Sequence, residues 1–278
     1  MADSPYSDLD RPPLSQEALT RALVRPGGLW TSVTVVEETG STNADLAAAV
    51  REGATPAADE GAVLVAELQT AGRGRLGRSW TTPPRSALMF SMVLRPGVPP
   101  PRIGWLPLLT GLATATAVRR LAETDVRLKW PNDLLIGERK LAGILAERVE
   151  TAVIVGVGLN VSLHGDELPV ETATSLAEEK AACLDRDPLL RAVLREFEAH
   201  YRDWVAADGD PEASGLRSAY LTASATVGTE VRVDLPGGGT LTGPATDVDE
   251  NGCLIVRADG REHALSAGDV VHVRRDES

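Results

Sequence analysis

Short apolar runs, with polar residues between them, dominate the first half of the chain. Runs rich in valine, isoleucine and leucine predict β-strands at 30–38, 61–69, 87–96, 126–130 and 151–161. The stretch 133–149 reads as two further strands that turn back on each other at Gly137 and Glu138. We therefore expect one β-sheet to form the centre of this part of the protein.

Other segments repeat their apolar residues every three or four positions, which is typical of helices. This spacing predicts helices at 15–24, 42–52, 105–123 and 186–207. Ser41, Thr42 or Asn43 can cap the start of the second helix, and Gly53 ends it. Strands and helices mixed along one chain indicate an α+β fold.

The segment 186–207 is strongly amphipathic. We expect Asp187 to cap this helix and Pro188 to occupy its first turn. Its apolar face, which predicts packing against a core, consists of Leu190, Val193, Leu194, Phe197, Tyr201 and Trp204.

The pattern changes after about residue 223. Short strands alternate there with the turn sequences PGGG, ENG and ADG, which predicts a small all-β barrel of about 50 residues. We therefore divide the chain into a flexible tail at 1–28, a catalytic domain at 29–220 and a β-barrel domain at 221–278. The expected fold class is α+β, with a central mixed β-sheet, flanking helices and a small C-terminal barrel.

Composition narrows the functional classes. The 278 residues carry a formal net charge of -12, which opposes general binding to nucleic-acid phosphates. Cys183 and Cys253 lie far apart in the sequence, so neither a disulfide framework nor a structural zinc site is expected. The N-terminus lacks the features of a signal peptide, and no apolar run reaches membrane-spanning length. We expect a cytoplasmic protein that does not bind membranes.

Residues 71–80, AGRGRLGRSW, concentrate positive charge on a flexible backbone. Arg73, Arg75 and Arg78 can each bind two oxygens of a phosphate or carboxylate, and glycine lets the backbone approach an anion. Trp80 can stack on a ring-shaped ligand. The residues fit a lid over an anionic nucleotide, or else a solvated basic loop. They match neither a Walker loop nor a dinucleotide-binding turn, because the lysine spacing and the following helix are absent.

The sequence KWPND follows another predicted strand. It presents Lys129, Asn132 and Asp133 together on a turn, since Pro131 disfavours a helical conformation before it. A lysine and a carboxylate at a strand end can bind a nucleotide phosphate and its Mg²⁺. The alternative is an ordinary turn stabilised by its own side chains.

Two more polar positions lie in predicted strands. Lys140 begins the sequence KLAGILAE and can neutralise a ligand carboxylate, although a lysine at a hairpin tip is the simpler interpretation. Gly143 within the same strand, and Gly156 and Gly158 before Asn160, mark places where a ligand or backbone can come close.

Five motifs occur in one order: GSTN, QTAGRGRLGRSW, KWPND, KLAGILAE and GVGLN. This succession, over about residues 30–162, resembles the biotin protein ligases. The resemblance implies a fold of the biotin–lipoate ligase type, similar to class II synthetases, followed by an SH3-like barrel. It also implies a reaction in which biotin and ATP, with Mg²⁺, form biotinyl-5′-AMP. The biotinyl group then passes to a lysine of a biotin carboxyl carrier domain of an acyl-CoA carboxylase.

The resemblance also implies which residues are catalytic, which bind biotin and which bind the nucleotide. The catalytic residues are Lys140, Arg75 and Asp133, and Asp133 is also the expected metal contact. The residues implied to bind biotin are Ser41, Thr42, Asn43, Gln69, Arg73, Gly74, Arg75, Lys140 and Gly143. The residues implied to bind the nucleotide are Arg73, Arg75, Arg78, Trp80, Lys129, Asn132 and Asn160.

Some members of the family carry an N-terminal winged helix and repress transcription. About 28 residues precede the first strand here, so the chain resembles the short form and we expect no operator binding. Two alternative functions stay open. One is a lipoate–protein ligase or lipoyl transferase, which has a similar fold, and the other is a non-catalytic adapter that binds a nucleotide.

Overall fold

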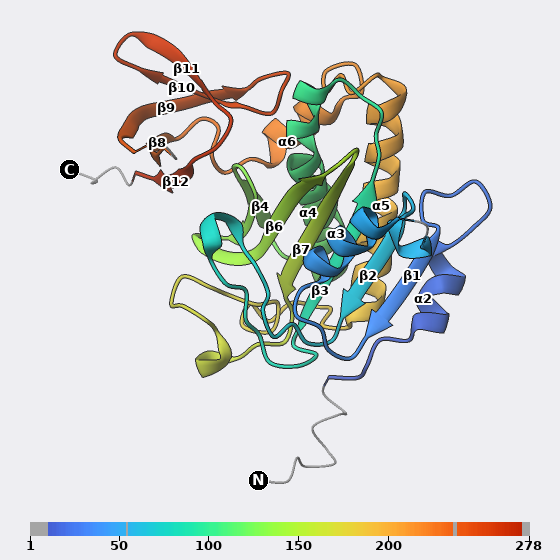
Figure 1. The fold of residues 1–278 in the computed structure, drawn as a ribbon. Coiled ribbons are helices and arrows are strands. Elements are labelled where there is room, and N and C mark those ends of the chain that lie inside the picture. Colours follow the sequence, from blue (N-terminus) through green and yellow to red (C-terminus); the bar gives the residue numbers. More distant parts are fainter. Residues whose placement is uncertain (1–10, 54, 236–237, 274–278) are drawn as a thin grey trace.

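The computed structural model describes residues 11–53, 55–235 and 238–273. Its centre is a seven-stranded mixed sheet with the strand order β1-β2-β3-β7-β6-β5-β4 (Figure 1). Strands β1 and β2 pair in parallel, and every other neighbouring pair in this sheet is antiparallel. The strands are β1 (Ser32–Val36), β2 (Ala62–Ala66), β3 (Ala87–Leu94), β4 (Val126–Lys129), β5 (Asp133–Ile136), β6 (Arg139–Val149) and β7 (Ala152–Asn160).

Helices cover both faces of the sheet. Helices α4 (Trp105–Ala122) and α5 (Arg186–Ala206) share one hydrophobic cluster with Val153, Val155 and Val157 of β7. Helix α3 (Thr42–Glu52) packs on the other face, in a second cluster that includes Ile154. Because side chains alternate along a strand, the α3 face of β7 carries the even-numbered positions, two of which are glycine.

Some of the expected helix-end signals are confirmed and others are not. Ser41 precedes α3 with extended backbone but makes no side-chain cap, and Gly53 ends the helix with a φ of 68°. The expected cap of α5 is wrong by two residues: Asp185 is the cap and accepts a hydrogen bond from the backbone N–H of Asp187. Asp187 lies in the first turn and pairs with Arg191 at 2.6 Å. The six residues predicted to form the apolar face of α5 are all buried, as expected.

The helix predicted at 15–24 is present, but it is packed on the sheet rather than part of a flexible tail over 1–28. Residues 1–10 lie outside the described residues, but α2 (Gln16–Leu23) is an ordered helix that buries Leu19 and Leu23 in the main core. Glu67 accepts a hydrogen bond from the backbone N–H of Leu14 at 2.6 Å and pairs with buried Arg186 at 2.5 Å. A buried ion pair and two buried leucines therefore fix the described part of this segment to the sheet.

A second sheet follows α6 (Leu216–Ala223) and lies beyond β4 in Figure 1. It is antiparallel, with the order β11-β10-β9-β8-β12, so the small β domain forms as a five-stranded sheet. Its strands are β8 (Glu230–Asp234), β9 (Thr240–Val248), β10 (Leu254–Ala258), β11 (Arg261–Leu265) and β12 (Asp269–His272).

The two sheets share one core. Val231 and Val270 of the second sheet belong to the same hydrophobic cluster as the residues around α4. Trp130 is buried at the junction, where its indole N–H donates to the carbonyl of Gly252 at 3.0 Å. The second sheet is therefore packed against the end of β4.

Four short 3₁₀ turns complete the described structure: η1 (Pro56–Ala58), η2 (Arg75–Gly77), η3 (Pro100–Gly104) and η4 (Gly165–Glu167). Cys183 and Cys253 are free thiols. Across the described ranges, no helix combines the length and the apolar character that a bilayer crossing requires.

Candidate active site

The candidate site lies on the α3 face of the central sheet, where a row of paired residues crosses four strands. Gly158 of β7 pairs with Gly143 of β6, Gly143 with Asp133 of β5, and Asp133 with Lys129 of β4. Directly paired residues in antiparallel strands point to the same face. The two glycines leave a trough in this face, and the charged residues lie beside it.

Trp80 covers this trough with its indole ring. A Cβ added to Gly158 would lie 2.7 Å from Cζ2 and 2.8 Å from Nε1 of the indole, and one added to Gly143 would lie 3.3 Å from the ring. Only glycine leaves room for so close an approach. Trp80 thus contacts the sheet, and the trough is a place where a flat group fits against backbone.

Lys140 and Asp133 stand at one end of the trough. Their Nζ and Oδ1 atoms are 2.7 Å apart, and Lys140 Nζ is 6.0 Å from the centre of the Trp80 ring. The register between β5 and β6 shifts after Leu134, because β6 has one extra residue at this point. Such a bulge re-aims the following side chains, which explains how Lys140 reaches the face that Gly143 occupies.

Polar side chains at the start of α3 form a buried network at the other end. Gln69 Oε1 accepts from the backbone N–H of Thr42 at 2.8 Å and lies 3.1 Å from the Thr42 hydroxyl. The Thr42 and Ser91 hydroxyls are 2.6 Å apart, and Ser91 donates to Asn43 Oδ1 at 2.6 Å. Ser41, Thr42 and Asn43 are all buried. The network fixes donors and acceptors in place before any ligand arrives.

Glu147 joins this network to the Arg-Gly loop, which we define as residues 71–80. Its Oε2 accepts from Asn43 Nδ2 at 2.7 Å and lies 3.3 Å from the guanidinium of Arg73. The amide of Asn43 also donates to the carbonyl of Leu145 at 3.3 Å. The hydrogen-bonding groups of Asn43 are therefore occupied by the protein itself.

The Arg-Gly loop is folded as a narrow hairpin. The backbone N–H of Gly74 donates to Arg78 at 2.6 Å, and that of Trp80 donates to Gly72 at 2.8 Å. Leu76 at the tip has a φ of 56° and is 66% exposed, a conformation that non-glycine residues rarely adopt and that often marks functional loops.

The arginines of the loop reach three different parts of the molecule. Arg73 contacts Glu147 of β6, and Arg75 donates to Asn132 Oδ1 at 2.8 Å on the turn between β4 and β5. Arg78 forms an ion pair with Asp269 of β12, in the second sheet. The loop therefore bridges the trough, the KWPND turn and the C-terminal sheet.

The charges around the loop perturb one another. Burial lowers the pKa of Arg75, and the nearby carboxylate of Asp133 opposes this shift. The hydrogen bond from Arg78 lowers the pKa of Asp269, and the charge of Lys129 acts in the same direction. Four cations and two carboxylates thus gather at one end of the trough, where an anionic ligand would find positive charge (Lys129, Lys140, Arg75, Arg78, Asp133 and Asp269).

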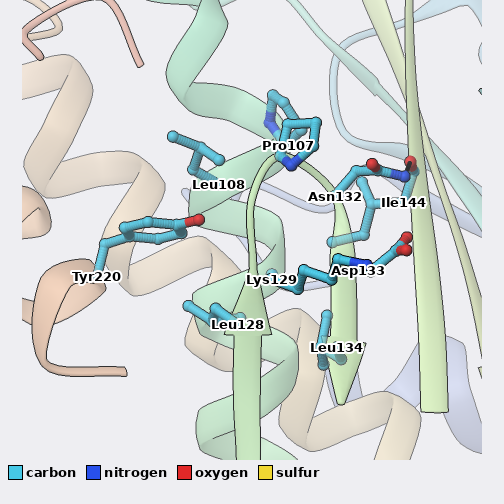
Figure 2. Close-up of a pocket in the computed structure, with 11 residues that line it drawn as sticks. Pro107, Leu108, Leu128, Lys129, Asn132, Asp133, Leu134, Ile144 and Tyr220 are labelled. Atoms are coloured by element: carbon cyan, nitrogen blue, oxygen red, sulfur yellow. Dashed lines mark hydrogen bonds between the residues drawn. The ribbon is translucent and has the colours of Figure 1, made fainter. Parts of the chain in front are cut away.

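The KWPND turn presents its polar residues beside α4. Figure 2 shows Lys129, Asn132 and Asp133 on this turn, around a cavity of about 10 Å³ that can hold a single water. A larger groove, about 410 Å³, lies between the two sheets and includes Arg75 and Asn132 in its lining. Its size falls in the range of small-molecule sites.

Two buried polar atoms at the site, Trp80 Nε1 and Asp133 Oδ1, have no hydrogen-bond partner, and neither has Oδ1 of Asn160 at the end of β7. The contact between Asp133 and Lys140 is close but lacks hydrogen-bond geometry, so this oxygen still has no donor. Asn160 uses its amide N–H to bind the carbonyl of Thr174 at 2.9 Å. Unpartnered buried polar atoms are rare in native proteins, and a ligand or an ordered water is their usual partner.

The described residues contain no group of three histidine, cysteine or acidic side chains that could hold a metal ion. At the charged end of the trough, Asp133 offers one carboxylate, whose Oδ1 lies 2.7 Å from Lys140 Nζ. Such a donor set fits Mg²⁺ bound to a nucleotide, because Mg²⁺ often takes only one or two protein carboxylates and fills its other positions with phosphates and water.

The structure brings most of the sequence-predicted residues to this one face. Ser41, Thr42, Asn43 and Gln69 gather at one end, and Lys129, Asn132, Asp133, Lys140, Gly143 and Arg75 gather at the other. Arg78 is instead held by the second sheet, and Asn160 is buried against the segment near Thr174.

Sequence reasoning missed three residues that contact the site: Ser91, Glu147 and Asp269. Ser91 is the one hydroxyl residue in the apolar run 87–94, a signal that could have identified it. Glu147 closes the KLAGILAE motif without a distinguishing local pattern, and Asp269 lies more than a hundred residues farther along the chain.

Comparison with known proteins gives matches to both parts of the chain. Residues 35–162 match the model of the biotin/lipoate A/B protein ligase family, and residues 226–273 match that of the biotin protein ligase C-terminal domain. The chain is 44% identical over 270 residues to the biotin--[acetyl-CoA-carboxylase] ligase of Mycobacterium tuberculosis, covering 95% of this chain and 97% of that protein.

Two further matches are more distant. The bifunctional ligase/repressor BirA of Bacillus spizizenii is 34% identical over 208 residues, which are 72% of this chain and 62% of that protein. The biotin protein ligase from Aquifex aeolicus in complex with biotin and ATP superimposes with a TM-score of 0.72 at 28% identity. That superposition covers 88% of this chain and all of the Aquifex chain.

Proposed function

Because the chain belongs to the biotin protein ligases, we propose that it activates biotin with ATP and attaches it to a carrier protein. The product of the first step is biotinyl-5′-AMP, and the acceptor is a lysine of a biotin carboxyl carrier domain of acetyl-CoA carboxylase or a related enzyme. The 44% identity to a named biotin--[acetyl-CoA-carboxylase] ligase over nearly the full length of both chains carries this proposal.

In the first step, a carboxylate oxygen of biotin attacks the α-phosphorus of ATP. The new O–P bond replaces the bond to the bridging oxygen, and pyrophosphate leaves. Two anions must approach each other, so positive charge and fixed positions supply most of the catalysis. The proposal assigns this charge to Lys140 and Arg75 at the end of the trough, with Lys129 beside them.

The trough itself suits the body of biotin. Its glycines, Gly143 and Gly158, leave a flat surface when the Trp80 ring lifts from it, while Thr42 and Gln69 offer fixed hydrogen-bonding groups at the far end. The proposal places the ureido ring of biotin at this network and its carboxylate near Lys140. A fixed orientation of this kind brings the two reacting groups together.

The Arg-Gly loop is proposed to close over the intermediate. An acyl-adenylate is hydrolysed readily, and a loop that covers it excludes water until the carrier arrives. Arg73, Arg75 and Arg78 would bind the phosphate and carboxylate oxygens, and Trp80 would pack against the adenylate.

In the second step, the amine of the carrier lysine attacks the acyl carbon of biotinyl-5′-AMP. An amide bond forms, AMP leaves, and the amine loses a proton. Asp133 is the proposed group to accept that proton, because its carboxylate lies beside Lys140 at the charged end of the trough. Asp133 is the carboxylate that would face a Mg²⁺ ion bound to ATP, and such an ion would neutralise phosphate charge.

The direct test is incubation of the protein with biotin, MgATP and a carrier domain, followed by mass spectrometry of the carrier. Biotinylation adds one biotinyl group to one lysine, and omission of ATP abolishes the gain. A carrier that keeps its original mass under all conditions refutes the proposal.

Lipoate is the second candidate substrate, because the matched family includes lipoate ligases by name. ATP–pyrophosphate exchange with biotin or lipoate as the only acid separates the two. We expect exchange with biotin alone. A nucleotide-binding adapter would bind ATP without biotin and give no exchange at all. DNA binding is not part of the proposal, because the net charge of -12 opposes it.

A further inference from the structure

Glu147 occupies a special position along the trough. Gly143, Leu145 and Glu147 are alternate residues of β6, so their side chains share the α3 face of the sheet. Glu147 is four positions along the strand from Gly143, a distance of about 13 Å. Glu147 therefore lies at the end where α3 begins, remote from Lys140 and Asp133.

One oxygen of Glu147 serves two donors. Its Oε2 accepts from Asn43 Nδ2 at 2.7 Å, and Arg73 approaches the same atom to 3.3 Å. Asn43 is buried and is held in turn by Ser91, so the carboxylate is fixed from the protein side. Arg73 meets it from the solvent side, where the two side chains are 46% and 31% exposed.

This contact competes with the role proposed for Arg73. A guanidinium that binds the carboxylate or phosphate of a ligand must first leave the carboxylate of Glu147, which lies at the opposite end of the trough from Lys140. Ligand binding must therefore supply the free energy that breaks the contact between Arg73 and Glu147. The remaining loop arginines are held by other partners, Asn132 and Asp269, and do not share this acceptor.

We propose that Glu147 is a positioning residue that holds Arg73 at the α3 end of the trough in the ligand-free protein and releases it to the anionic ligand. This inference rests on the proposed function. It predicts that removal of the Glu147 charge strengthens biotin binding, the opposite of what damage to the site produces. An ion pair as exposed as this one changes an equilibrium by about 1.5- to 5-fold.

The test variant is Glu147→Gln, which removes the charge but keeps an oxygen that can accept from Asn43. We expect the KM for biotin in ATP–pyrophosphate exchange to fall by about 1.5- to 5-fold. The same substitution in an Arg73→Ala background should leave that KM unchanged, because the cation that competes is gone. Glu52→Gln is the matched control: Glu52 is exposed at the end of α3, and its loss of one charge should have no effect.

A second measurement needs no ligand. Trypsin should cleave after Arg73 about 1.5- to 5-fold faster in Glu147→Gln than in the unmodified protein, because the loop has lost one anchor. A KM that rises or stays constant, or an effect that persists without Arg73, overturns the inference and leaves the proposed function intact. Absence of biotin-dependent exchange in the unmodified protein overturns the proposed function. In that case an unchanged rate of trypsin cleavage in Glu147→Gln overturns the role of the Glu147 contact as well.

Discussion

Two glycines of β7, two residues apart on the same face, should respond in opposite ways to the same substitution. At Gly156 an added Cβ would overlap Asn43 Oδ1 and lie 3.0 Å from its Cγ and 3.1 Å from Ser91 Oγ. At Gly158 the three atoms nearest to the Cβ all belong to the indole of Trp80. Neither glycine has a positive φ, so the difference comes from the neighbours and not from the backbone.

Gly156→Ala should destabilise the protein strongly. Asn43 is buried and fixed by hydrogen bonds to Ser91 and Glu147, so it cannot move aside without losing them. Two lost hydrogen bonds weaken the fold by about 2 kcal/mol, and overpacking adds about 1–3 kcal/mol. The gain from replacing glycine within a strand offsets at most about 1 kcal/mol. We expect a net loss of about 3 kcal/mol in the free energy of unfolding.

Gly158→Ala should change the fold much less. Trp80 is partly exposed and belongs to the Arg-Gly loop, so its ring can lift from the trough. We expect the free energy of unfolding to stay within about 1 kcal/mol of its original value, since the lost ring contact is partly offset by the strand preference of alanine over glycine. Biotin-dependent pyrophosphate exchange should nevertheless fall, because the methyl group occupies the trough.

Urea denaturation followed by circular dichroism separates the two cases. With a slope of about 3 kcal/mol per molar urea, Gly156→Ala should lower the midpoint by about 1 M, and Gly158→Ala should leave it nearly unchanged. Equal shifts in the two variants would falsify the idea that Asn43 is immovable and Trp80 is not. A larger shift for Gly158→Ala would reverse the assignment of the two neighbours.

Three further predictions follow from the charged end of the site. Lys140→Ala should reduce ATP–pyrophosphate exchange by at least about 100-fold, because it removes a cation beside the negative charge that develops in the transition state. The urea midpoint should change little, and unchanged exchange would refute the role of Lys140. Arg75→Ala should release biotinyl-5′-AMP into solution before transfer, which chromatography of the quenched reaction detects, whereas a fully retained intermediate would contradict the lid. Asp269→Asn should be less stable at neutral pH by less than about 1 kcal/mol. Arg78 lowers the pKa of Asp269 below its usual value of about 3.9, so this contribution is present above that pH and is lost as the pH falls through the lowered pKa. Denaturation over a pH series should show the gap between the two proteins close only below about pH 4, and a gap that persists at lower pH would exclude the ion pair as its cause.

Much of the site could be predicted because its residues lie close together in the sequence and obey strand alternation. Gly156 and Gly158 are separated by one residue, which already places both on one face. The motif KWPND presents its polar groups on one tight turn in the structure, as the proline indicates. The family resemblance to the biotin protein ligases, drawn from five ordered motifs, is confirmed by the matches to both domains and to a close relative.

Other contacts depend on distant parts of the chain and gave no local signal. Arg78 finds Asp269 only because the second sheet packs against the end of β4, a placement that depends on tertiary packing around Trp130. Lys140 reaches the trough because of a one-residue bulge in the strand pairing. Strict alternation of side chains, without the bulge, would place Lys140 on the opposite face of the sheet.

In the N-terminal segment, the helix at 15–24 was predicted correctly, but its attachment to the sheet was not predicted. Proline and charge suggested a flexible tail, but Leu14, Leu19 and Leu23 have a partner surface that only the folded sheet provides. Glu67 and Arg186, far apart in sequence, meet beneath this segment and fix it. Local composition therefore underestimates order wherever a short helix is stabilised by distant residues.

The distribution of tryptophan gives the protein a built-in optical reporter. Trp30, Trp105, Trp130 and Trp204 are at most 1% exposed, whereas Trp80 alone of the five is partly exposed and lies on the trough. Their emission should stay constant while the fold is intact, so a change in intrinsic fluorescence when substrate is added would come from the one indole that covers the trough. The occupancy of the trough could then be followed in real time without any attached dye.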